Sequence, residues 1–155
     1  MRKCVFAMLS LGSVVLLTSC GWFTPEEPPI YRAGQMEIRR TYTYDLDTGT
    51  EAPWSGADLW WEFETDVERY LVPRNGAKFS LLGNVDFEVI GYKDLLGYEY
   101  SSNPINGSDN ENNQIPTGTV VAYITDEGRY GKFRVDSYGE NLEVTFVTYD
   151  KPPWP

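Results

Sequence analysis

Short runs of alternating apolar and polar residues, separated by turns, fill the chain from about residue 36 onwards. The runs are rich in Val, Ile, Thr, Tyr and Phe, which favour strands, and Gly, Asn and Asp interrupt them. No long window repeats apolar residues with the 3.6-residue period of a helix. The pattern predicts an all-β domain, either a small antiparallel barrel or a sandwich.

The C-terminal part of the domain gives the clearest prediction. Leu142, Val144 and Phe146 alternate with polar residues, as in a strand with one buried face. Two Gly-containing turns precede this run and connect similar runs before it. We therefore expect a three-stranded antiparallel meander. Its strands are predicted at 119–125, 129–137 and 142–149.

Five further strands are predicted before the meander, at 36–44, 58–64, 69–72, 78–82 and 87–92. The dipeptide Asn75-Gly76 favours a tight turn between two of them. Residues 93–96 suit a single helical turn. The polar stretch 101–118 predicts a long loop.

The first twenty residues have the layout of a secretory signal peptide. Two basic residues precede an apolar run over 4–17, which is short for a membrane span. The run ends in Leu17-Thr18-Ser19-Cys20, which resembles the lipobox of bacterial lipoproteins. The resemblance implies cleavage between Ser19 and Cys20, and diacylglyceryl and N-acyl (palmitate) groups on Cys20. The alternative is a plain signal peptide with an incidental cysteine.

Two or more acyl chains hold a protein stably on a membrane without a spanning helix. The resemblance therefore implies a lipid anchor in the cell membrane, on the extracytoplasmic side, and in the outer membrane if the bacterium is Gram-negative. Four parts are expected along the chain. They are a signal peptide (1–19), a lipidated Cys20 with a Pro-rich tether (20–35), a single β domain (36–150) and a Pro-rich tail (151–155).

Charge and composition exclude several functions. The sequence has 23 acidic and 13 basic residues, a net charge of −10, which disfavours nucleic acid as a partner. Cys4 leaves with the signal peptide and Cys20 carries lipid, so no disulfide is expected in the mature domain. The chain has no His, which removes His-based nucleophilic catalysis and His-ligated zinc. We expect no cofactor.

Two acidic stretches are calcium candidates, because calcium prefers clustered oxygen ligands on tight turns. The first holds Asp45 and Asp47, and the second holds Asp109 and Glu111. Neither matches the EF-hand spacing, since Gly49 comes one position early and Gln114 stands where the glycine is needed. A polar turn explains both stretches, so we expect no metal site and keep the two stretches as weak candidates.

Aromatic residues offer a second candidate site. Exposed rings bind sugars by stacking, but aromatic residues also fill the cores of β domains. Because adjacent side chains of a strand point to opposite faces, we expect one of Trp60 and Trp61 in the core and the other outside. The ligand candidates are Trp54, Trp60, Trp61 and Tyr70.

A run of alternating carboxylates, Glu62, Glu64, Asp66 and Glu68, is the third candidate. Glycosidases need two carboxyl groups across a cleft, whereas one strand face supplies no cleft and such a run is more typical of a solvated surface.

Segments 44–49 and 58–62, with the C-terminal meander, resemble a β module of extracellular bacterial proteins. That resemblance implies a compact extracellular domain and transfers no site. We therefore expect a non-catalytic, lipid-anchored envelope protein with a binding or structural role, whose partners are the membrane and either an envelope glycan or another envelope protein. A carbohydrate-binding module is the alternative, and a carboxylate-only hydrolase is the third possibility.

Overall fold

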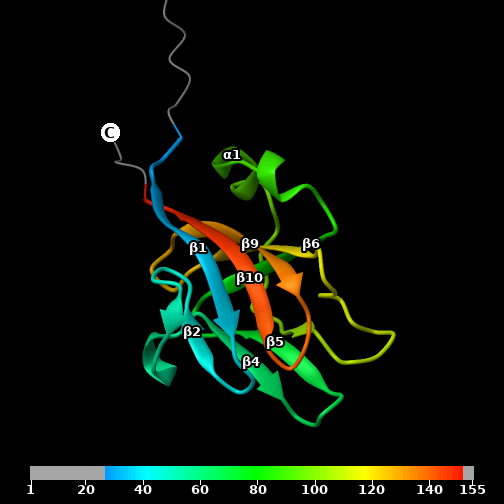
Figure 1. Ribbon diagram of the computed structural model, residues 1–155. Helices are drawn as coiled ribbons and strands as arrows, with labels where there is room; N and C mark the ends of the chain where they lie inside the picture. Colours follow the sequence, from blue (N-terminus) through cyan, green and yellow to red (C-terminus); the bar gives the residue numbers. More distant parts are fainter. Residues whose placement is uncertain (1–26, 152–155) are drawn as a thin grey trace, which may run out of the picture.

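Two antiparallel five-stranded sheets face each other in the computed structural model, which describes residues 27–151 (Figure 1). The prediction of an all-β fold is confirmed, with the sandwich as the observed form. The first sheet has the order β1 (Ile30–Ile38), β10 (Leu142–Tyr149), β9 (Tyr130–Ser137), β8 (Val120–Ile124), β6 (Lys78–Gly83). The second has the order β3 (Thr50–Glu51), β2 (Thr43–Asp45), β4 (Leu59–Phe63), β5 (Arg69–Pro73), β7 (Ile105–Asn106).

The predicted meander is confirmed as β8, β9 and β10, which are neighbours in the first sheet. Phe133 faces Val121 on one side and Phe146 on the other, so all three side chains point to the same face of the sheet. They belong to a single buried core that lies between the sheets. The alternation read from the sequence therefore identifies the inner face correctly.

Trp61 of β4 is the largest side chain of this core and is fully buried. Its indole N–H donates to the backbone carbonyl of Glu140, 2.8 Å away, so its polar atom is satisfied. Trp60, its neighbour, points outward and is half-buried. The prediction that the two rings separate between core and outside is confirmed.

The single strand predicted at 36–44 is wrong, because this segment contributes to both sheets. The chain leaves β1 at Ile38 and enters β2 at Thr43, after a turn in which Thr41 has a φ of 65°. β1 also begins earlier than expected, at Ile30, so residues 30–35 pair with β10 and do not belong to the tether.

The strand predicted at 87–92 is also wrong. A 3₁₀ turn, η2 (Phe87–Val89), and the short helix α1 (Tyr92–Leu95) cover the outer face of the first sheet instead. The buried Lys132 side chain lies on the outer face of β9, and its ammonium group donates hydrogen bonds to the carbonyls of Phe87 and Ile90. Those carbonyls therefore bind an ammonium group and not a neighbouring strand. The helical turn predicted at 93–96 is confirmed in α1.

A second 3₁₀ turn, η1 (Trp54–Gly56), precedes β4. The tight turn predicted at Asn75-Gly76 is confirmed by positive φ values of 51° and 99°. The loop predicted at 101–118 contains the two-residue strand β7. No helix within residues 27–151 is long and apolar enough to cross a membrane. The signal peptide, Cys20, the start of the tether and residues 152–155 lie outside the described residues.

Gly131 of β9 tests how tightly the core is packed. A methyl group at this position would lie 2.3 Å from the ring of the fully buried Tyr123. We expect Gly131→Ala to lower the free energy of unfolding by about 3 kcal/mol, as measured by equilibrium urea denaturation. The control is Gly34→Ala in β1, where the nearest side-chain atom is 3.9 Å away. Equal stability of the two variants would contradict this packing.

A candidate metal centre between the sheets

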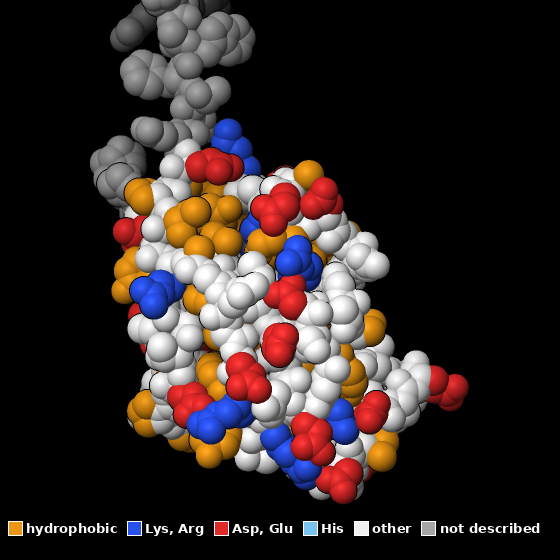
Figure 2. All heavy atoms as spheres, viewed as in Figure 1, with side chains coloured by type: hydrophobic (Ala, Val, Ile, Leu, Met, Phe, Trp, Pro, Cys, Tyr) orange, Lys and Arg blue, Asp and Glu red, His pale blue; other side chains and the backbone are white. Residues whose placement is uncertain are grey.

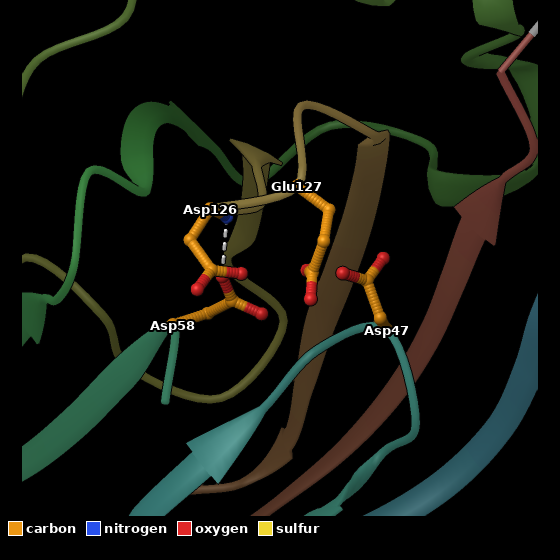
Figure 3. A group of neighbouring side chains, drawn as sticks. All are labelled: Asp47, Asp58, Asp126 and Glu127. Carbon is orange, nitrogen blue, oxygen red and sulfur yellow. Dashed lines mark hydrogen bonds between the residues drawn. The ribbon is translucent and has the colours of Figure 1, made fainter. Parts of the chain in front are cut away.

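Four carboxyl groups meet at one end of the sandwich, in what we call the acidic cluster: Asp47, Asp58, Asp126 and Glu127 (Figure 3). One oxygen of each lies within 4.8 Å of the others. The four residues come from three separate segments: the loop after β2, the residue before β4, and the turn between β8 and β9. The first two segments belong to the second sheet and the third belongs to the first sheet. The cluster therefore lies where the two sheets meet, which we call the joint.

The loop after β2 turns Asp47 inward. The Asp45 carboxylate accepts hydrogen bonds from the backbone N–H groups of Asp47, at 2.7 Å, and Thr48, at 3.2 Å. Gly49 then adopts a φ of +69°, and a methyl group there would lie 2.3 Å from the Phe146 ring. Only glycine accommodates both the positive φ and the close approach of the Phe146 ring, so the loop closes tightly over the core.

Asp58 links all three segments. It is fully buried, and its two carboxylate oxygens accept hydrogen bonds from the backbone N–H groups of Leu46, at 2.8 Å, and Asp126, at 2.6 Å. The second of these bonds crosses from one sheet to the other and is the dashed line in Figure 3. The Asp58 carboxylate therefore accepts hydrogen bonds from the backbone of two different turns and holds them together.

The turn between β8 and β9 presents the other two carboxyl groups. Gly128 has a φ of +80°, and the N–H of Thr125 donates to the carbonyl of Arg129 at 2.8 Å to close the turn. Asp126 and Glu127 are both exposed. The cluster therefore opens to solvent on this side, while Asp47 and Asp58 form its buried floor.

The charges of the cluster are poorly balanced. Asp47 is 3% exposed, and neither of its carboxylate oxygens accepts a hydrogen bond from the described residues. Arg129 approaches one of them, with Nη1 3.3 Å from Oδ1. Within residues 27–151 no other Lys or Arg nitrogen lies within 4.0 Å of the cluster. One guanidinium thus faces four carboxyl groups.

The pKa values respond to this imbalance. Burial raises the pKa of Asp58 to about 8, and the neighbouring Asp126 and Asp47 carboxylates add to the shift. Burial also raises the pKa of Asp126. The adjacent Asp47 carboxylate raises the pKa of Glu127. Without a bound cation, the cluster therefore retains protons that isolated carboxyl groups would lose.

Only one of the four calcium candidates from the sequence, Asp47, belongs to the cluster. Asp45 instead shapes the loop through its hydrogen bonds. Asp109 pairs with Arg69, with Oδ2 3.3 Å from Nη2, and Glu111 is exposed on the loop. The sequence analysis missed Asp58, Asp126 and Glu127, because they come from segments far apart in the chain and no spacing rule connects them.

The aromatic candidates divide between core and surface. Trp61 is fully buried, so it is wrong as a ligand-stacking residue. Trp54 is 51% exposed and its ring centroid lies 5.0 Å from that of Trp60. Arg74 covers one face of Trp54 at 3.7 Å from the ring centroid. Tyr70 lies on β5 and is half-buried, on the same outer face as Trp60.

The four residues of the alternating carboxylate run do not come together in a site. Glu62 lies on the outer face of β4, and the other three members, Glu64, Asp66 and Glu68, lie in the exposed turn that leads to β5. Asp66 pairs with Arg40 at 2.8 Å. In the described structure this run therefore behaves as a solvated face.

Comparisons with protein-family models, with curated proteins and with solved structures find no match to this chain.

Asp58 makes the stability of the metal-free protein depend on pH. In the unfolded chain its carboxyl ionises near 3.8, whereas in the folded protein it keeps its proton up to about pH 8. Its contribution to stability is complete below about pH 4 and is lost as the pH rises through about 8. In a chelating buffer, we expect the free energy of unfolding to fall by about 1 to 3 kcal/mol between about pH 5 and pH 8.

Urea denaturation at several pH values measures this dependence, and Asp58→Asn is the variant that isolates it. The variant loses stability at every pH, because an amide cannot accept both backbone N–H groups. Its pH dependence should nevertheless be smaller than that of the wild type. A wild-type protein that becomes more stable over this pH range would contradict the assignment.

Proposed function

We propose that the protein is a lipid-anchored cell-envelope protein on the extracytoplasmic side that acts without catalysis, by binding or by structural contact. The observation that carries this proposal is the N-terminal sequence: basic residues, an apolar run and Leu17-Thr18-Ser19-Cys20 in succession. The β domain that follows needs neither cysteine of the chain, so Cys20 is free to carry lipid.

The geometry of the chain ends supports anchoring at one end of the sandwich. β1 begins at Ile30, so the segment after Cys20 reaches at most about 35 Å. The N–H of Asp150 donates to the carbonyl of Pro29 at 2.7 Å, which fixes the start of β1 beside the end of β10. In Figure 1 both described ends leave the same end of the molecule, where α1 also lies.

The alternating carboxylate run Glu62, Glu64, Asp66 and Glu68 supports a role other than catalysis, because it lies along one strand and the turn after it and supplies no pair of carboxyl groups across a cleft. On the face shown in Figure 2, acidic and basic side chains are interspersed, a distribution that supports a solvated surface and argues against a nucleic-acid partner.

Two kinds of envelope partner fit such a protein: a glycan and another envelope protein. The indole pair of Trp54 and Trp60 favours the glycan, since the half-exposed Trp54 ring lies beside the half-buried Trp60 ring on the outer surface. A carbohydrate-binding module is therefore the second candidate function.

Cys20→Ala tests the anchor. We expect the variant to lose labelling by radioactive palmitate and to leave the membrane fraction, or to accumulate as uncleaved precursor. The matched control is Cys4→Ala, which changes the other cysteine of the chain and should label and fractionate like the wild type. Unchanged labelling of Cys20→Ala would rule out the lipid anchor.

Trp54→Ala tests the glycan candidate. If the indole pair binds sugar, retention on insoluble peptidoglycan or on a glycan array should become about tenfold weaker in the variant. Tyr42→Ala is the control, because Tyr42 is 45% exposed and also lies under an arginine, with Arg39 4.1 Å from its ring centroid. No wild-type binding at millimolar sugar would remove this candidate.

A further inference from the structure

We propose that the acidic cluster is a calcium-binding site that clamps the two sheets together, with Asp47 and Asp58 as its floor and Asp126 and Glu127 as its outer ligands. This site goes beyond the proposed function and does not depend on it, because every ligand lies within the folded domain.

Asp47 points to a cation independently of the clustering. Its side chain is 4% exposed, and neither carboxylate oxygen accepts a hydrogen bond from the described part of the chain. In Figure 3 it is aimed at the Glu127 carboxyl group across the cluster. Arg129 forms an ion pair with this carboxylate, with Nη1 3.3 Å from Oδ1, and no described residue donates a hydrogen bond to Oδ2. A buried carboxylate oxygen in this state is costly unless a positive charge meets it.

Charge balance requires more than Arg129 supplies. The guanidinium compensates one of four carboxyl groups, and it is shared with Asp150, whose Oδ1 lies 3.7 Å from its Nε. A divalent cation between the carboxylates removes most of the remaining negative charge. Arg129 would stay at the rim, where it also stacks on the Tyr31 ring of β1 at 4.0 Å.

The dimensions of the cluster favour calcium. One oxygen of each carboxyl group lies within 4.8 Å of the others, and calcium can bridge such separations because its 2.3–2.6 Å bonds put opposite ligands about 4.6 to 5.2 Å apart. Magnesium holds oxygens at about 2.0 to 2.1 Å in a strict octahedron and gives up its water reluctantly. A floor of two buried carboxylates with fixed directions suits the larger and more adaptable ion.

The hydrogen bonds of the cluster are compatible with a bound ion. Each Asp58 oxygen accepts one backbone N–H and keeps a second lone pair for the metal. These N–H groups also orient the carboxylate, as outer partners do in metal sites. The exposed side at Asp126 and Glu127 provides a path for the ion to enter.

Calcium would supply a cross-link that this domain otherwise lacks. The only two cysteines of the chain, Cys4 and Cys20, lie outside the described domain. The cation would connect the loop after β2 and the start of β4, in the second sheet, to the turn between β8 and β9, in the first. Binding only to the folded state, it would stabilise the sandwich by mass action.

The test uses the full-length chain, stripped of metal and kept in a non-ionic detergent so that it stays soluble with or without a lipid anchor. Isothermal titration with CaCl₂ should show one site with a Kd of about 10⁻⁵ to 10⁻³ M. About 5 mM CaCl₂ should raise the Tm by roughly 5 to 15 °C over NaCl of equal ionic strength.

Two variants remove ligands, and a third serves as the control. Asp47→Asn should abolish the calcium-dependent shift in Tm. Glu127→Gln changes an exposed turn residue that does not endanger folding, and it should weaken calcium binding at least about tenfold. Glu111→Gln makes the same change as Glu127→Gln at an exposed loop residue outside the cluster, so its shift should match the wild type.

Three results would overturn the proposal: no calcium binding at about 5 mM, an undiminished shift in both Asp47→Asn and Glu127→Gln, or a shift equally large with MgCl₂. Failure of the lipid anchor leaves all of these readouts unchanged, so the two proposals are tested separately.

Discussion

The burial of two aspartates at the joint between the sheets is the constraint on which this end of the structure depends. Asp47 and Asp58 lie within the sandwich, where an unbalanced negative charge is costly. Asp58 offsets part of that cost by accepting two backbone N–H groups from different turns. The remaining charge must be met by Arg129, by protons or by a cation. Protons and a bound cation would therefore compete for the same oxygens, and either would stabilise the contact between the sheets.

Small residues make this joint possible. Gly49 lets the loop after β2 close over Phe146, and Gly128 lets the turn between β8 and β9 bring Asp126 to Asp58. The joint lies near the first and last strands, because Thr148 of β10 donates to the carbonyl of Leu46 at 2.7 Å. A cation there would reinforce the region of the domain from which the chain continues towards Cys20.

Much of the fold could be predicted from alternation and turn residues, because strands such as 142–149 have one buried face. The errors fall where tertiary contacts override local preference. Residues 36–44 are uniformly strand-like, so nothing local indicates that Thr41 breaks them between two sheets. Residues 87–92 look like a strand, but the buried Lys132 binds their carbonyls. Only one member of the acidic cluster could be predicted from the sequence. Asp47 is recognisable as an acidic residue in a loop, whereas the pairing of distant strands brings the other three residues to it.

A crystal structure of the protein grown with calcium would show whether the acidic cluster holds the ion. We expect an ion with anomalous signal between the four carboxyl groups, at about 2.3 to 2.6 Å from oxygens of Asp47, Asp58 and at least one residue of the β8–β9 turn. A cluster that stays free of calcium in such crystals, with Arg129 as the only cation beside Asp47, would contradict the calcium site.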